Sequence, residues 1–137
     1  MKFLYLVLAS LLATSATADS MILPYKGVYD GDTIYTELCG LPQTLKKVSI
    51  RLTGIDTPEI KTSCISEKVL GLAAKKYLET LLSGQTELLV KDVEWDKFGG
   101  RIDGDILLPN GKSVSALMIA AGHAQAYTGG VRASWCK

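Results

Sequence analysis

Two short acidic stretches contain the residues best suited to chemistry. Asp32 lies in the stretch Asp30-Gly31-Asp32-Thr33, and Asp56 begins the stretch Asp56-Thr57-Pro58-Glu59. The two carboxylates and the Thr57 carbonyl, completed by water, would suit Ca²⁺, which accepts about six to eight oxygen ligands in irregular geometry. Mg²⁺ would accept the same atoms but needs stricter octahedral placement. The alternative is a simple turn, and for Asp30-Gly31 taken alone the turn is the better explanation.

A third carboxylate and two arginines add the groups that phosphodiester hydrolysis requires. Glu59 is close in sequence to the proposed ligands, so it is a candidate to orient or deprotonate a water molecule. The guanidinium groups of Arg51 and Arg101 suit a phosphate and would offset the charge that builds up when phosphorus is attacked. Together these residues predict a metal-assisted phosphodiester hydrolase.

The element that must position Asp56 is a strand. Apolar and polar residues alternate over residues 48–55, which indicates a strand with one buried face. Pro58 cannot donate a hydrogen bond to a sheet and disfavours the helical conformation at Thr57, so the strand ends there. An extended segment at residues 25–38 carries Asp32. We expect this segment and residues 45–55 to form a long hairpin.

The elements that follow the acidic stretches predict a small α+β domain. Residues 65–82 have the apolar spacing of a long helix, with Ser66 as N-cap, Gly84 as stop and Gly71 as a point of close packing. The remaining expected elements are strands at residues 86–95 and 102–108 and a short helix at residues 113–121. We expect a strongly curved barrel, because three to five short strands would otherwise leave edges exposed.

The N-terminal residues 1–18 have the pattern of an export signal. Lys2 precedes an apolar run at residues 3–12, and Ala16-Thr17-Ala18 is a typical cleavage site. A buried helix is the alternative, and the run is too short to be a stable membrane anchor. We therefore expect a chain processed to residues 19–137, exported to the periplasm or out of the cell, with no membrane anchor.

Length and charge limit the function further. The chain has 137 residues, enough for one domain with a core. It contains 15 Lys and Arg and 14 Asp and Glu, and removal of Lys2 with the signal leaves 14 of each. This balance argues against a protein that holds nucleic acid by a broad positive field. A polyanionic substrate would have to be attracted by a few placed basic residues or by a bound cation.

Three cysteines are present, so one disulfide and one free thiol are expected in an exported protein. We predict a disulfide between Cys64, at the start of the long helix, and Cys136, in a tail that otherwise has little to hold it. Cys39 lies in a turn and is expected to be free. The single histidine, His123, gives little support to histidine-based metal sites or catalytic pairs.

Three stretches resemble the signature regions of the staphylococcal nuclease (thermonuclease) family in order and rough spacing. They are Asp30-Gly31-Asp32-Thr33, Arg51 with Asp56-Thr57-Pro58-Glu59, and Asp96-Lys97-Phe98-Gly99-Gly100-Arg101. The resemblance covers about residues 28–127, and the tail is similar to that of the short exported bacterial members. It implies a five-stranded OB-fold barrel and a Ca²⁺-dependent endonuclease that cuts DNA and RNA to 3′-phosphates. We expect a monomer.

The same resemblance implies roles for individual residues. Asp32, Asp56 and the Thr57 carbonyl match the calcium ligands, Glu59 matches the proposed general base, and Arg51 matches a phosphate-binding arginine. Further residues expected at the site are Arg101 as the second arginine, and Lys97 and Tyr127 as substrate contacts.

Three departures from the family pattern bear on the site. Phe98 replaces a tyrosine, which removes a hydroxyl contact to the substrate. An extra glycine, Gly99 or Gly100, precedes Arg101, so a bulge would be needed to bring this arginine to the phosphate. The chain also stops soon after Tyr127, where the family has a third helix.

Two rival functions remain open. A non-catalytic nucleic-acid-binding OB module would have little reason to carry Asp32, Arg51, Asp56 and Glu59 together in a neutral protein. A disulfide-stabilised interaction domain would bind no metal.

If the acidic side chains lie close together without a cation, they should repel one another. We therefore expect Asp32→Asn to abolish most activity while the metal-free protein melts no earlier than the wild type.

Overall fold

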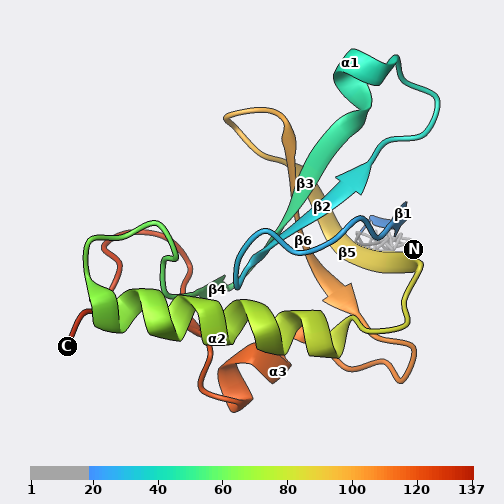
Figure 1. Cartoon of the computed structure of the whole chain (residues 1–137). Coiled ribbons are helices and arrows are strands. Elements are labelled where there is room, and N and C mark those ends of the chain that lie inside the picture. Colours follow the sequence, from blue (N-terminus) through green and yellow to red (C-terminus); the bar gives the residue numbers. More distant parts are fainter. Residues whose placement is uncertain (1–18) are drawn as a thin grey trace, which may run out of the picture.

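The computed structural model describes residues 19–137. The predicted export signal at residues 1–18 lies outside the described residues. Ten elements follow one another within these described residues (Figure 1). They are β1 (Ser20–Pro24), β2 (Thr33–Glu37), α1 (Gln43–Lys46), β3 (Lys47–Leu52), β4 (Ile55–Asp56), α2 (Ile65–Leu81), β5 (Glu87–Trp95), β6 (Arg101–Leu107), α3 (Val114–Ala120) and β7 (Gln125–Ala126).

Five strands form one mixed sheet in the order β1-β5-β6-β3-β2. The predicted hairpin is confirmed as the antiparallel pair of β2 and β3, while β3 and β6 run parallel. The predicted α+β class is therefore correct, but the predicted closed barrel is not, since β1 and β2 are the open edges of the sheet. Pro24 ends β1 and has no N–H to donate. Beyond it, Lys26 donates to the Tyr35 carbonyl at 3.0 Å, so the edges approach without forming a continuous ladder.

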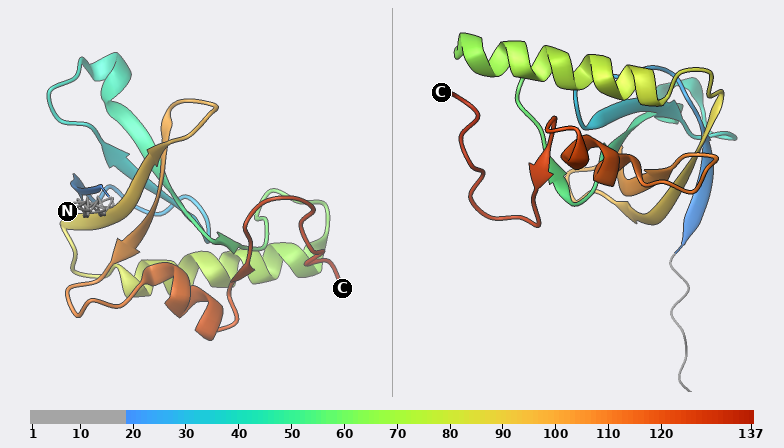
Figure 2. Two further views of the ribbon diagram at one scale, coloured as in Figure 1. Left: turned by 180° about the vertical axis from the view of Figure 1, so that it is seen from behind. Right: turned by 90° about the horizontal axis from the view of Figure 1, so that it is seen from below.

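The core follows directly from the alternation in the strands. Val48, Ile50 and Leu52 of β3 point inward and are almost completely buried. Helix α2 lies across one end of the sheet with α3 beside it (Figures 1 and 2), and contributes the buried side chains of Ala74 and Leu78. Burial of a large aliphatic side chain such as Ile50 or Leu78 stabilises the fold by about 1.5–3 kcal/mol.

Two glycines allow the acidic stretches to come close to α2. A Cβ on Gly71 would lie 2.8 Å from the Pro58 carbonyl oxygen, which confirms the predicted close packing at this helix position. A Cβ on Gly31 would lie 2.9 Å from side-chain atoms of Ala74 and Thr57. Helix α2 therefore contacts both acidic stretches closely, one through the Gly71 backbone and the other through the Ala74 side chain.

The sequence reasoning missed three local features. Strand β1 and the short helix α1 were not expected, and α2 begins after Cys64 as N-cap, not after Ser66. The Ser66 hydroxyl instead donates to the Lys137 carbonyl at 3.0 Å. The predicted short helix at residues 113–121 is confirmed as α3, with Ser113 as an N-cap that accepts from the Ala116 N–H.

The C-terminal tail returns to the start of α2, beside the segment at residues 57–64 (Figure 2). The predicted disulfide joins Cys64 to Cys136, with 5.9 Å between the Cα atoms, and Cys39 is free and exposed. None of the helices in residues 19–137 has both the length and the apolar character needed to cross a membrane.

Candidate active site

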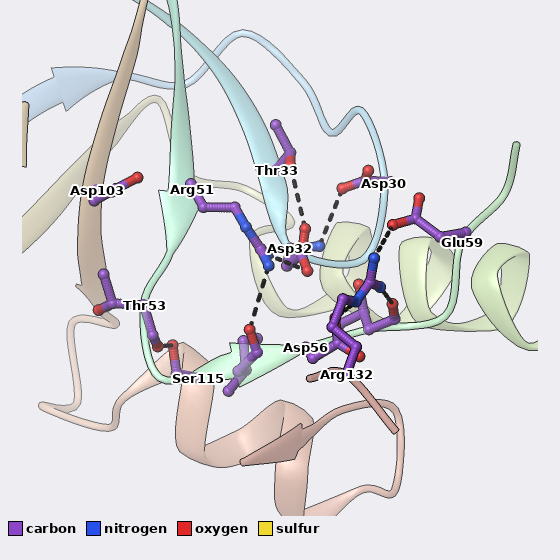
Figure 3. A network of polar contacts seen from close by, with 12 residues as sticks. Asp30, Asp32, Thr33, Arg51, Thr53, Asp56, Glu59, Asp103, Ser115 and Arg132 are labelled. Carbon is purple, nitrogen blue, oxygen red and sulfur yellow. Dashed lines mark hydrogen bonds and ion pairs between the residues drawn. The ribbon is translucent and has the colours of Figure 1, made fainter. Parts of the chain in front are cut away.

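Three strand ends bring the predicted site residues together. Asp32 directly precedes β2, and its carbonyl accepts a hydrogen bond from the Leu52 N–H at 2.9 Å. Arg51 of β3 lies opposite Thr33 in the sheet register, and Asp56 ends β4. Figure 3 shows that the side chains of these elements converge.

Arg51 and Asp32 form a largely buried ion pair. The Arg51 guanidinium also donates to the Ile55 carbonyl at 3.4 Å, which ties β3 to the residue before Asp56. Burial lowers the pKa of Arg51, although the nearby charge of Asp30 opposes this effect. The Thr33 hydroxyl donates to Asp32 Oδ1 at 3.2 Å, so this carboxylate has two partners.

Asp30 supports this arrangement from beside Asp32. Its Oδ1 accepts a hydrogen bond from the Asp32 N–H at 3.2 Å, which is the geometry of an Asx turn. Burial raises the pKa of Asp30, while hydrogen bonding to Thr33 and the charge of Arg51 act in the opposite direction. The turn interpretation of this aspartate is therefore confirmed.

Glu59 follows the strand end and is held by its backbone. Its N–H donates to Glu67 Oε1 at 3.1 Å, and Glu67 Oε2 accepts from the Thr62 hydroxyl at 3.0 Å. Glu67, in the first turn of α2, thereby fixes the segment that carries Glu59. The Glu59 side chain itself is 45% exposed, which leaves its carboxylate accessible from solvent.

Arg132 was not predicted as a site residue, yet it contacts three of the predicted ones. Its Nε lies 2.5 Å from Asp56 Oδ1, its Nη1 lies 2.7 Å from Glu59 Oε1, and its Nη2 donates to the Thr57 carbonyl at 3.2 Å (Figure 3). Burial alone would lower the pKa of Arg132, but hydrogen bonds to Glu59 and Asp56 raise it. Only its place in the Gly-Gly, Arg, Trp-Cys tail could have drawn attention to it.

Trp135 completes the contact between the tail and Asp56. The indole Nε1 donates to Asp56 Oδ2 at 2.9 Å, so both oxygens of this carboxylate have a partner from the tail. Asp56 is only 1% exposed. A buried carboxylate needs such partners, because an unpaired one would be strongly destabilising. Trp135 therefore anchors the tail to Asp56.

The predicted ligands offer the type of donor atom that a hard cation binds. Asp32, Asp56 and the Thr57 carbonyl offer oxygen atoms, which Ca²⁺ and Mg²⁺ prefer. Asp56 Oδ1 is buried and accepts no hydrogen bond, although Arg132 is paired with it. Within residues 19–137, no group of three or more His, Cys, Asp and Glu side chains is arranged to hold a metal. Both carboxylates are paired with arginines, Asp32 with Arg51 and Asp56 with Arg132.

Arg101 begins β6, where it lies opposite Ser49 of β3, and Lys97 lies in the connection before it. The Arg101 guanidinium pairs with Asp96 at 2.7 Å and with Asp103 at 3.7 Å. The Lys97 ammonium lies 5.0 Å from the centroid of the Phe98 ring, in the connection between β5 and β6. In Figure 1 this connection is well separated from β4. The structure thus does not bring Lys97 to the carboxylates.

Tyr127 lies close to the site through β7. Its N–H donates to the Gly54 carbonyl at 2.9 Å, and Gln125, two residues earlier, pairs with Asp56. The Tyr127 hydroxyl donates to the Gly130 carbonyl at 2.9 Å, which turns the ring toward the tail. Its predicted role as a substrate contact stays a prediction.

Comparison with known proteins identifies the family of this chain. The family model described as staphylococcal nuclease homologue matches residues 49–134. An uncharacterized endonuclease of Escherichia coli is 34% identical over 100 residues, which cover 73% of this chain and 57% of that protein. A second, from Escherichia coli O157:H7, is 33% identical with the same coverage, so the chain spans little more than half of these relatives. The chain belongs to the staphylococcal nuclease homologue family.

Proposed function

We propose that this chain is a metal-dependent endonuclease that hydrolyses the phosphodiester bonds of DNA and RNA. The observation that carries the proposal is the convergence of Asp32, Arg51, Asp56 and Glu59 at the strand ends, in a member of this family. Two relatives described as endonucleases support the same reaction class. The finer assignments of Ca²⁺ as cofactor and of 3′-phosphate products belong to the same proposal.

Each residue has a distinct task in this reaction. Asp32, Asp56 and the Thr57 carbonyl would hold the cation, which supplies electrostatic stabilisation of the attacked phosphate when bound. The exposed carboxylate of Glu59 accepts a proton from the attacking water. Arg51 donates hydrogen bonds to the phosphate oxygens as negative charge builds up on them. The bond to the 5′ oxygen breaks, and the phosphate stays on the 3′ oxygen.

The experiment that tests the proposal is a digestion assay on the purified protein. Single-stranded DNA and RNA are incubated with Ca²⁺, with Mg²⁺ and with a chelator, and the Glu59→Gln variant serves as the matched control. We expect cleavage with Ca²⁺, none with chelator, and a loss of at least about hundredfold in the variant. Binding without cleavage by the wild type would contradict the proposal and favour a non-catalytic nucleic-acid-binding module.

Export is part of the proposal as well. The N-terminal pattern at residues 1–18 and the Cys64–Cys136 disulfide both fit a periplasmic or secreted protein, because disulfides persist in oxidising compartments. N-terminal sequencing of protein recovered outside the cytoplasm should begin at Asp19. A sequence that begins at Met1 would contradict the predicted cleavage.

A further inference from the structure

We propose, on the basis of the nuclease function above, that a pocket beside Glu59 binds a nucleotide that flanks the attacked phosphate. The pocket has a volume of about 370 Å³, within the usual range for small ligands. Glu59 forms part of its wall, so a nucleotide in the pocket would lie next to this residue. The side chains that suit a nucleotide are Tyr29, Tyr35, Lys61, Leu72 and Lys75.

The lining combines two aromatic rings with two lysines, Lys61 and Lys75, and two acidic residues, Asp30 and Glu59. The Tyr29 and Tyr35 rings pack edge to face with 5.7 Å between centroids, and both tyrosines are partly exposed. The Lys61 ammonium lies 5.3 Å from the centroid of the Tyr29 ring. Aromatic faces with nearby lysines are the usual means by which proteins bind single-stranded nucleic acid, with the base stacked and the backbone phosphate near the cation.

Binding can be tested separately from hydrolysis. Fluorescence anisotropy would measure the affinity of a labelled oligothymidylate for the Glu59→Gln protein, alone and combined with Tyr29→Ala, Tyr29→Phe or Lys61→Ala. We expect Tyr29→Ala to weaken binding about tenfold, Tyr29→Phe to restore most of it because a ring remains, and Lys61→Ala to weaken it with a smaller salt dependence. Lys76→Ala, on the exposed side of α2, should have no effect.

The outcomes separate the pocket from the nuclease function. Unchanged affinity in both Tyr29→Ala and Lys61→Ala, with normal thermal melts, would overturn the pocket even if the wild type cleaves DNA. Weakened binding in these variants would support the pocket even if the wild type cleaves nothing, in which case only the hydrolase assignment fails.

A different observation points to a second inference, about the tail. We infer that residues 129–137 are a latch that competes with the metal ion for its ligands. Arg132 contacts Asp56 and the Thr57 carbonyl, two of the three proposed ligands, together with Glu59. A guanidinium is itself a cation, so it balances the charge of Asp56 while it stays in place. A metal that uses Asp56 has to displace it.

The disulfide keeps this latch in place. Cys136 is bound to Cys64, and Lys137 also pairs with Ser66 at the start of α2. A tethered group competes at a high effective concentration, so Arg132 returns to the carboxylates quickly after it leaves. Dithiothreitol reduces the disulfide to two thiols and becomes a cyclic disulfide itself. Reduction would therefore lower the local concentration of Arg132 and favour metal binding.

Calorimetric Ca²⁺ titration tests the latch without any nuclease assay. We expect tighter Ca²⁺ binding, by about tenfold, for Arg132→Gln than for wild type, and a smaller gain for wild type reduced with dithiothreitol. Lys76→Gln removes one positive charge elsewhere and should bind like the wild type. Equal or weaker Ca²⁺ binding by Arg132→Gln would overturn the latch. If no variant binds Ca²⁺, the cofactor assignment fails together with the latch.

Discussion

Within residues 19–137, two clusters place one arginine between two acidic side chains, and they differ in how far apart their members lie in the sequence. Arg101 pairs with Asp96, five residues away, and with Asp103. Arg132 pairs with Asp56 and with Glu59, which is 73 residues away. The first cluster closes a local loop between β5 and β6. The second joins the chain terminus to the acidic strand end.

The difference in sequence separation distinguishes an ion pair that holds a loop from one that indicates a functional site. A local pair such as Arg101 with Asp96 forms whenever the hairpin forms, so it gives little information about a site. The long-range pair instead involves a deeply buried carboxylate, Asp56. Removing this charge from water carries a desolvation cost that the rest of the fold has to offset. Such costly arrangements are typical of functional sites.

The largest effect should distinguish the two arginines of the predicted mechanism. Arg51→Gln removes the guanidinium at the convergent strand ends and should lower kcat/KM by at least about hundredfold. Arg101→Gln should lower it by only about tenfold, because the partners of Arg101, Asp96 and Asp103, are not proposed metal ligands, whereas the partner of Arg51, Asp32, is one. Steady-state kinetics on one DNA substrate measures both values. Equal losses would mean that Arg101 leaves its local cluster to reach the phosphate.

The next prediction revises an expectation drawn from the sequence. We now expect Asp32→Asn to lose activity and also to melt earlier than the wild type without metal. The carboxylate does not suffer unrelieved repulsion, since it neutralises the buried guanidinium of Arg51. Loss of that charge leaves a buried guanidinium unpaired, which should cost about 3–5 kcal/mol. Thermal melts with and without Ca²⁺ test this, and a metal-free variant as stable as the wild type would contradict the importance of the pair.

A smaller effect concerns the contact between α2 and the acidic strand end. Gly71→Ala would place a methyl group against the Pro58 and Glu59 carbonyls, so the segment has to shift. Overpacking of this kind costs about 1–3 kcal/mol, partly offset by a helix preference of about 1 kcal/mol for Ala over Gly. Urea unfolding and kinetics should both show a loss. Ala73→Gly, on the exposed side of the same helix, should cost about 1 kcal/mol without affecting activity.

The smallest effect belongs to the local cluster. Hydrogen bonds from Arg101 and from the Phe98 N–H lower the pKa of Asp96. A carboxyl group whose pKa is lower in the folded state stabilises the protein above its unfolded pKa, and this contribution is lost as the pH falls through the folded pKa. Asp96→Asn should therefore be less stable than the wild type at neutral pH, and the difference should shrink in acid. Urea unfolding from neutral to acid pH measures this difference in stability. A difference that does not change with pH would exclude the ionised carboxylate of Asp96 as its source.

Much of the secondary structure could be predicted from the sequence, because it depends on local residue patterns. The alternation around Ile50 predicted β3, the apolar spacing predicted α2, and Gly71 indicated a close approach that the structure confirms. The pairing of Cys64 with Cys136 also followed from position, since one cysteine begins a helix and the other ends a loose tail. Each of these predictions needed only neighbouring residues or covalent chemistry.

The charge arrangement of the site depended on contacts between distant segments, and only the tertiary structure decided it. The sequence placed the acidic residues near each other, but could not show that Arg132 and Trp135 would turn back onto Asp56. It also overestimated closure of the sheet, because the length of β1 and the position of Pro24 decide whether the edges meet. Periodicity reports which face of an element is buried, while the partner of a buried charge depends on the path of the whole chain.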